Sequence, residues 1–328
     1  LFSKPLDSTR KNLSGKFSFI NGDLQSEPLT ASWFNQPLNV DFSTKEGAKA
    51  YQVAVNLNGN WQPAKTGVLP EAVNEALSGS VAWDGKVGID LPYHAGATYN
   101  VELNGDLKNV SSHLPSPLAK PAGEPLAVNV KVDGNLNSFE LTGQAGADNH
   151  FNSRWLLGQK LTLDRVIWAA DSKTLPPLPE QSGVELNMPP MNGAEGLALV
   201  QKGAAESVGG AASFPQHITL RTPMLSLGNQ QWNNLSIVSQ PTANGTLVEA
   251  QGREINATLA MRNNAPWLAN IKYLYYNPSV AKTRGDSTPS SPFPTTERIN
   301  FRGWPDAQIR RTDCWLWGQK FGRIDSDL

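Results

Sequence analysis

Cysteine and charge are both scarce in this sequence. Cys314 is the only cysteine in 328 residues, so the chain can form neither an internal disulfide nor a zinc site of paired C-x-x-C motifs. Charged residues make up 17%, and the 28 basic and 29 acidic side chains leave a net charge of −1. Proteins that bind nucleic acid usually carry a clustered positive charge. We therefore expect no nucleic-acid partner.

Long apolar runs are also missing. No window approaches the roughly 18 apolar residues that would span a bilayer as a helix. The chain opens at Leu1 without an initiator methionine or an apolar leader. We therefore expect an internal segment of a longer protein, with any membrane anchor outside it.

Motifs for catalysis are lacking as well. Four histidines are widely separated in the sequence: His94, His113, His150 and His217. No pair has the H-E-x-x-H spacing of a helical zinc site, and no serine lies in a G-x-S-x-G motif. Asp148, Asp164 and Glu249 could form an acid/base pair only if the fold brings them together. We expect no enzyme activity, no cofactor and no metal, and an envelope polysaccharide enzyme remains a third hypothesis.

Alternation of apolar and polar residues is the dominant pattern that the sequence does contain. It is clearest at 51–57, 99–103, 126–132 and 255–261. Successive side chains of a strand point to opposite faces, so each run predicts a strand with one apolar face. The 28 glycines and 24 prolines fit many short strands joined by turns. The predicted fold class is all-β.

Turn signals and helix signals complete the outline. Asn-Gly and Asp-Gly dipeptides predict tight hairpin turns at 21–22, 58–59, 84–85, 104–105, 133–134 and 244–245. Short helices are expected at 70–77 and 193–208. Proline cannot donate to a ladder, which predicts irregular proline-rich loops at 111–125, 174–190 and 277–296.

A hexapeptide occurs twice. Trp155–Lys160 (WLLGQK) returns as Trp315–Lys320 (WLWGQK), and Leu225–Gly228 (LSLG) is a looser third copy. Each copy is expected to open a hairpin in the order strand, glycine turn, strand. The spacing predicts a quasi-periodic array in which neighbouring strands bury one another's faces.

Four stretches resemble the AsmA-like proteins of Gram-negative bacteria, and the resemblance runs over essentially the whole chain. They are LPY at 91–93 through LNGDL at 103–107 with LPSPLAK at 114–120, GREI at 252–255, PWLA at 266–269 to Leu274-Tyr275, and FRGWP at 301–305. The resemblance implies an extended, twisted antiparallel sheet curled into a hydrophobic groove, a β-taco of the repeating β-groove type with a few short helices. Residues 1–328 would then be one segment of a continuous β-groove.

The same resemblance implies a function and a location. It implies transport of phospholipid between the inner and outer membranes through a bridge-like periplasmic conduit, with acyl chains shielded in the groove. The anchor in the inner membrane would lie outside this segment. Outer-membrane or other envelope proteins are the expected further partners, and the chain is expected to be a monomer.

Alternation also suggests which residues line the groove. The candidates are Val53, Val55, Leu57, Val101, Leu103, Val128, Val130, Val132, Ile255 and Leu259. On pattern alone, the same residues would suit the closed core of a β-sandwich, and a one-residue register shift would move them all to the other face. The second hypothesis is therefore a structural or interaction β-sandwich in the cell envelope that binds no lipid.

Overall fold

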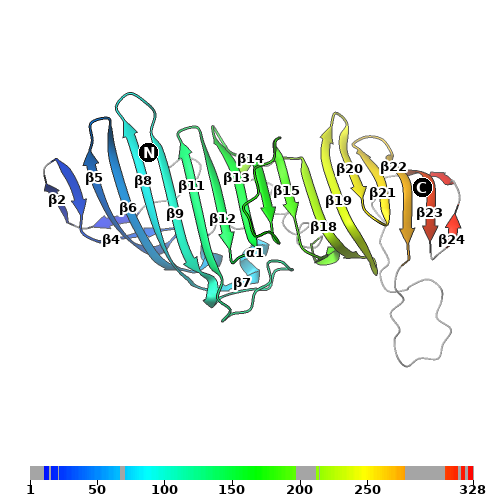
Figure 1. Cartoon of the computed structure of the whole chain (residues 1–328), viewed down its shortest axis with the longest axis horizontal. Coiled ribbons are helices and arrows are strands. Elements are labelled where there is room, and N and C mark those ends of the chain that lie inside the picture. The colour runs from blue at the N-terminus through cyan, green and yellow to red at the C-terminus, as the bar shows by residue number, and fades with distance from the viewer. Residues whose placement is uncertain are drawn as a thin grey trace. The chain divides into compact units, whose positions relative to one another are not determined.

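The computed structural model describes most of the chain (Figure 1), and the chain divides into two units. The described residues are 11–14, 16–20, 22–66, 71–196, 212–213, 215–277, 307–316, 319–321 and 324–327. Unit 1 comprises Leu1–Val184 with Ala198–Pro215, and unit 2 comprises Glu185–Leu197 with Gln216–Leu328.

Unit 1 is built almost entirely of strands. Its strands are β1 (Lys11–Ser14), β2 (Phe17–Ile20), β3 (Asp23–Ser26), β4 (Leu29–Trp33), β5 (Gln36–Glu46), β6 (Ala50–Trp61), β7 (Leu77–Gly79), β8 (Val81–Pro92), β9 (Thr98–Asp106), β10 (Val110–Ser112), β11 (Ala127–Asn135), β12 (Ser138–Ala145), β13 (Asn149–Leu157), β14 (Leu161–Ala169) and β17 (Ala212–Ser213). Its helices are the 3-10 turns η1 (Pro63–Lys65) and η2 (Leu107–Asn109) and the short helix α1 (Glu71–Ala76).

Unit 2 has the same character. Its strands are β16 (Met191–Asn192), β18 (Ile218–Leu227), β19 (Gln230–Thr242), β20 (Gly245–Gln251), β21 (Ile255–Arg262), β22 (Trp267–Tyr276), β23 (Ala307–Leu316), β24 (Gln319–Phe321) and β25 (Ile324–Asp327). Strand β15 (Gly183–Asn187) contains the boundary between the units. The all-β prediction is confirmed, and no helix within the described ranges is long and apolar enough to cross a bilayer.

Antiparallel ladders join the strands of each unit. In unit 1 they run in the order β4, β5, β6, β8, β9, β11, β12, β13, β14, and in unit 2 from β18 to β22. The four alternating runs fall in β6, β9, β11 and β21, as predicted. The ladders of β14 with β17, of β16 with β18 and of β22 with β23 are parallel. A parallel pair needs a long connection, and residues 277–306 between β22 and β23 provide one.

A small subdomain, which we call the cap, interrupts the antiparallel sequence of unit 1. It consists of 63–66, 71–79 and 110–120, including η1, α1 and the two-stranded sheet of β7 and β10. The backbone N–H of His113 donates to the carbonyl of Ala76 at 2.8 Å, and Ser112 pairs with Lys120. Val110 and Leu114 are buried within it. The cap therefore has its own small core at one end of β6 and β9.

The turn predictions were only partly right. Gly22 and Asn244 lie in hairpin turns, whereas 58–59, 84–85, 104–105 and 133–134 lie inside β6, β8, β9 and β11. A Cβ at Gly85 would lie 2.5 Å from Leu103 Cδ2, and one at Gly134 would lie 2.6 Å from the Tyr99 ring. These glycines are therefore needed because a large neighbouring side chain covers them, not because the backbone turns.

The other local predictions can be compared element by element. The hexapeptide copies and LSLG open hairpins, closed by the pairs Leu157–Leu161, Leu316–Gln319 and Leu227–Gln230. The helix predicted at 70–77 is α1, and of the one predicted at 193–208 residues 193–196 are helical, the rest lying outside the described residues.

The proline-rich segments contain little strand. Residues 111–112 belong to β10, and β15 lies within 174–190. Asn277 is the one described residue of 277–296. One continuous groove over 1–328 stays a prediction.

The glycine positions generate a stability test. Gly134→Ala should reduce the free energy of unfolding by about 1–3 kcal/mol, because the new Cβ would meet both the Tyr99 ring and the Cβ of Phe139 at 2.7 Å. Urea denaturation followed by tryptophan fluorescence measures the change.

Gly143→Ala is the matched control on the neighbouring strand β12. Its nearest neighbour would be the Cβ of Phe151 at an ordinary 3.8 Å, so we expect a change within about 0.5 kcal/mol. Equal losses in the two variants would contradict the proposed role of Gly134.

Candidate functional site: an open apolar face with a cleft

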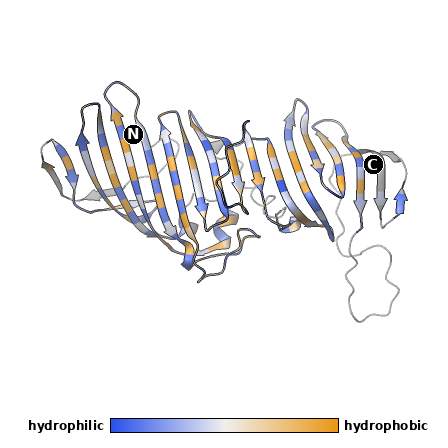
Figure 2. Ribbon diagram, viewed as in Figure 1, coloured by the Kyte–Doolittle hydropathy of each residue, from blue (hydrophilic) through white to orange (hydrophobic). Residues whose placement is uncertain are grey.

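Cross-strand pairing arranges the apolar residues of unit 1 into rows on one face of the sheet, which we call the apolar face. Figure 2 shows the alternation of apolar and polar residues along these strands. Paired residues of antiparallel strands point to the same side, so each row keeps its character across the ladder. From β5 through β6, β8 and β9 to β11, the rows are the Trp83 row (Leu38, Gly59, Trp83, Gly105, Val128), the Gly85 row (Val40, Leu57, Gly85, Leu103, Val130), the Val87 row (Phe42, Val55, Val87, Val101, Val132) and the Ile89 row (Thr44, Val53, Ile89, Tyr99, Gly134).

The opposite face of the same strands is polar. Asn56 Nδ2 donates to Asp41 Oδ1 at 2.7 Å, and Asn129 Nδ2 donates to Asn104 Oδ1 at the same distance. Lys131 lies 3.8 Å from Glu102. Such exposed pairs contribute little stability, but they solvate this face and leave the apolar face as the uncharged side.

A cleft of about 350 Å³ lies on the apolar face. It is lined by Trp33, Leu57, Trp61, Pro63, Thr66, Val81, Trp83, Val87, Val101, Leu103, Asn104, Gly105, Leu107, Val128 and Val130. None of these side chains is charged, and Thr66 and Asn104 are the only amide or hydroxyl residues among them. The cleft can therefore accommodate hydrocarbon but offers almost no hydrogen-bonding partners to a polar ligand.

The lining indicates that the sheet of unit 1 curves toward its apolar face. Strands β4 and β11 are separated by five ladder steps, which would be about 24 Å in a flat sheet. Nevertheless Trp33 of β4 and Val128 of β11 border the same cleft. The prediction of a curled sheet agrees with this geometry.

Four aromatic residues contact one another at the cleft, and we call them the aromatic cluster: Trp33, Trp61 and Trp83, which line it, and Phe34, which packs on Trp33 and Trp61. The rings of Trp61 and Trp83 meet edge to face with centroids 4.9 Å apart, and Trp33 stacks on Phe34 at 4.9 Å. Trp61 Nε1 donates to the carbonyl of Pro37 at 2.8 Å, which fixes its ring. Gly59 provides room for Trp83, whose Nε1 would lie 3.1 Å from a Cβ there.

The ten residues predicted to line the groove all lie in apolar rows. Five of them line the cleft: Leu57, Val101, Leu103, Val128 and Val130. Val53, Val55 and Val132 share the face but lie outside the cleft. In unit 2, Val248 pairs with Leu259 and Ile255 with Leu274, so the two remaining candidates also have apolar neighbours.

Exposure separates this face from a closed core. All ten candidates are half-buried, although strands flank every one but Ile255 on both sides. By contrast, Val166 of β14, which continues the Val87 row through Leu141 and Ser153, is 5% exposed. A sandwich core would bury the central rows most deeply. The apolar face from β6 to β11 is therefore open rather than covered by a second sheet.

Sequence reasoning missed the part of the cleft that lies outside the alternating runs. Trp33, Trp61, Val81 and Trp83 come from strand ends, and Pro63 and Thr66 come from the cap. Trp61, Val81 and Trp83 could have been predicted from the sequence. Trp61 continues the alternation of Leu57, and Val81 and Trp83 share the alternation of Val87, so each lies an even number of residues from a known apolar position. Nothing local identifies the cap residues, because only the fold brings them to the sheet.

Tyr99 marks the boundary of the apolar region. It belongs to the Ile89 row, and its ring covers Gly134. Burial raises the pKa of the Tyr99 phenol above its ordinary value, because the phenolate would lose hydration there. The neutral form of the phenol is thus favoured, and the Ile89 row carries no charge.

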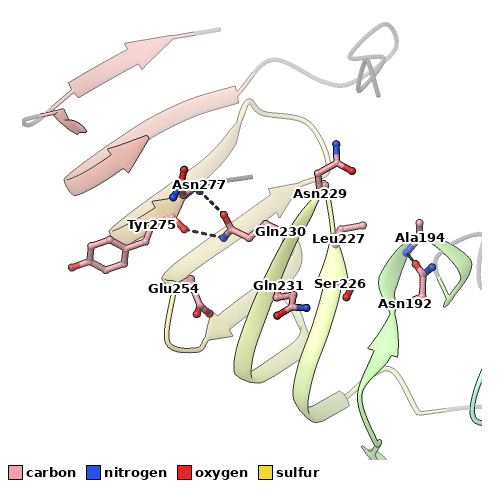
Figure 3. Close-up of a pocket in the computed structure, with 11 residues that line it drawn as sticks. Asn192, Ala194, Ser226, Leu227, Asn229, Gln230, Gln231, Glu254, Tyr275 and Asn277 are labelled. Carbon is pink, nitrogen blue, oxygen red and sulfur yellow. Dashed lines mark hydrogen bonds between the residues drawn. The ribbon is translucent and has the colours of Figure 1, made fainter. Parts of the chain in front are cut away.

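Unit 2 contains a hollow of a different kind, with a volume of about 750 Å³ (Figure 3). Its lining is mostly polar and includes Asn192, Ser226, Asn229, Gln231 and Asn277. Gln230 is buried beside it, and its Nε2 donates to the carbonyl of Tyr275 at 2.8 Å while its Oε1 accepts from the backbone N–H of Asn277. These bonds tie the β18–β19 hairpin to the end of β22. Ile255 and Leu259 do not line this hollow.

The acid/base candidates are divided between the two units, with Asp148 and Asp164 in unit 1 and Glu249 in unit 2. Asp164 accepts from Arg165 Nε at 3.2 Å. Across the described portion of the chain, no three His, Cys, Asp or Glu side chains gather as metal ligands would.

Fold and site together define a class: an all-β protein whose largely antiparallel strands present an open, uncharged apolar face with a cleft. The chain belongs to the YhdP protein family, whose model matches residues 1–328. The resemblance seen in the sequence, to the AsmA-like proteins and most closely to YhdP, is thereby confirmed.

One curated relative is the "Intermembrane phospholipid transporter YhdP" of Escherichia coli (strain K12), which is 97% identical over 328 residues. The match covers all of this chain and 26% of the relative, so the chain spans about a quarter of the relative's length. No solved structure matches the chain.

The contrast between Val132 and Val166 provides a test of the open face. Val166→Lys should cost about 4 kcal/mol or more, because it buries a charge without a partner. Val132→Lys, in the same row, should cost about 1–2 kcal/mol, since the lysine stem can cover apolar surface while its ammonium reaches water. Urea unfolding monitored by circular dichroism gives both values. A loss at Val132 as large as that at Val166 would indicate a closed core.

Proposed function

We propose that this chain forms part of a conduit that carries phospholipid between the inner and outer membranes, with acyl chains shielded on the apolar face. The lining would consist of Val53, Val55, Leu57, Val101, Leu103, Val128, Val130 and Val132 in unit 1 and of Ile255 and Leu259 in unit 2. The proposal places the chain in the periplasm, as a monomeric, non-enzymatic part of a protein whose inner-membrane anchor lies outside these residues. Outer-membrane or envelope proteins would be its further partners.

The observation that carries the proposal is the open apolar face. Eight of the proposed lining residues are half-buried on one face of β6, β9 and β11, where a globular domain would cover them. Large uncovered apolar surfaces on a protein usually mark a binding surface. An acyl chain fits because each CH₂ removed from water contributes about 0.8 kcal/mol without any need for a hydrogen bond.

The chemistry of the cleft supports a lipid tail rather than a polar substrate. None of the described residues that border it is charged, and the Thr66 hydroxyl already donates to the carbonyl of Pro63 at 2.8 Å. A sugar or a phosphate would lose more hydrogen bonds to water there than the cleft could replace, since its lining offers few donors, such as the indole N–H of Trp83. The relative's name, an intermembrane phospholipid transporter, agrees with such a ligand.

Movement along such a face needs no catalytic group. Dispersion contacts are individually weak and similar from one row to the next. A tail can therefore exchange one set of contacts for an equivalent set without breaking a strong bond. The polar face on the other side of the strands would stay in water throughout.

Lipid binding by the purified full chain tests the proposal. Native mass spectrometry with lipid extraction should detect co-purifying phospholipid. Leu57→Asp places a carboxylate in the cleft and should reduce lipid occupancy at least about tenfold, since 1.4 kcal/mol is enough for that change. Circular dichroism must show that the variant remains folded.

Asn58→Asp is the matched control, because it adds the same charge one residue away on the polar face. Asn58 Oδ1 accepts from Asn39 Nδ2 at 3.0 Å, and an aspartate retains that acceptor. Lipid occupancy should be unchanged. A folded, lipid-free wild-type protein would reject the conduit and favour an envelope scaffold that binds no lipid.

A further inference from the structure

The apolar face of unit 1 is not uniform along the strands, and its two ends differ in chemistry. At the cap end, the cleft is bounded by Trp61, Pro63 and Leu107. It takes lining residues from the Trp83, Gly85 and Val87 rows and none from the Ile89 row. The enclosed part of the face therefore lies entirely between the Val87 row and the cap.

Polar groups appear at the other end of the same strands. The Ile89 row includes two hydroxyl groups, that of Tyr99 and that of the buried Thr44, which is hydrogen-bonded to the backbone of Leu24. One step beyond it, the exposed Glu46 pairs with Tyr51, which pairs with Leu91. The turns at 47–49 and 93–97 follow, and Lys49 and His94 are exposed there. Polarity thus increases from the cap toward these hairpin tips.

The length of this gradient matches a lipid tail. Each row is two residues from the next, a step of about 6.7 Å along a strand. The hydrocarbon core of a bilayer is about 30 Å thick, so the tails of one leaflet extend about 15 Å. Two steps from the Gly85 row to the Ile89 row cover about 13 Å. A tail that ends in the cleft would therefore have its ester near the first hydroxyl groups of the face.

We infer that each bound acyl chain lies along the strands, with its methyl end in the cleft beside the aromatic cluster and the cap, and its ester at the Ile89 row. The headgroup then leaves the face over the hairpin tips at 47–49 and 93–97. This assigns a subsite for the end of a hydrocarbon chain, and it rests on the proposed function. The alternative arrangement, with tails lying across the strands, would not use the polarity gradient.

Photo-cross-linking of the wild-type full chain measures the orientation directly. Two phosphatidylethanolamine probes are used, one with a diazirine at the terminal carbon of an acyl chain and one with the diazirine next to the ester. Mass spectrometry of the labelled peptides should locate the terminal probe on 57–66, 81–83 and 103–107. The ester-proximal probe should label 44–53 and 89–99. Each probe should favour its own set by several-fold.

The outcomes separate the inference from the proposed function. Equal labelling of both sets by both probes, or the reverse order, would overturn the orientation while leaving phospholipid binding intact. Absence of labelling by either probe on unit 1 would reject the apolar face as a lipid site, and the inference with it.

A cleft-filling variant gives an independent readout. Val128→Trp adds a large side chain to the Trp83 row and should reduce labelling of 81–83 and 103–107 by the terminal probe several-fold. Labelling of 89–99 by the ester-proximal probe should fall less. Lys131→Trp is the control, because Lys131 is exposed on the polar face of the same strand. Unchanged terminal labelling in a folded Val128→Trp protein would contradict the subsite.

Discussion

Cross-strand register is the constraint on which the rest of this structure depends. From β5 to β11 the pairing shows no shift, so the residues of the Val87 row stay on one face across five strands. A slip of one residue at any ladder would replace Val101 by Glu102 or Val132 by Lys131 and bring charge onto the apolar face. The open face and its polar reverse both follow from the ladders remaining in phase.

Glycine is the second element that shapes the face. Leu103 lies over Gly85 and Tyr99 over Gly134, so large side chains occupy space that a Cβ would fill on the neighbouring strand. This complementarity lets bulky residues lie flat against the sheet. It also explains why Asp84-Gly85 and Asp133-Gly134 were wrongly predicted as turns. An Asp-Gly dipeptide favours a hairpin turn when it is considered alone. That its glycine instead leaves room for a large side chain becomes visible only when the neighbouring strand is known.

The difference between an open face and a core depends on what covers the sheet, not on the strands themselves. Val132 and Val166 belong to one row, yet the first is half-exposed and the second is buried. An exposed apolar face costs free energy in water, and a hydrocarbon ligand would recover part of it. The proposed lipid role gives a physical reason for keeping several neighbouring rows uncovered. The amide-lined hollow of unit 2, by contrast, forms hydrogen bonds that hold a hairpin in place.

The sequence by itself determined the strand character, the apolar phase of β6, β9, β11 and β21, and the family, because alternation and short motifs are local properties. It could not decide between groove and sandwich, since both require the same alternation. Only the tertiary structure decided that Leu57, Leu103 and Val130 stay half-exposed, and that Trp33, Pro63 and Thr66 join them around one cleft. Those residues are distant in sequence, and their meeting depends on the curvature of the sheet and on the position of the cap, which no local pattern encodes.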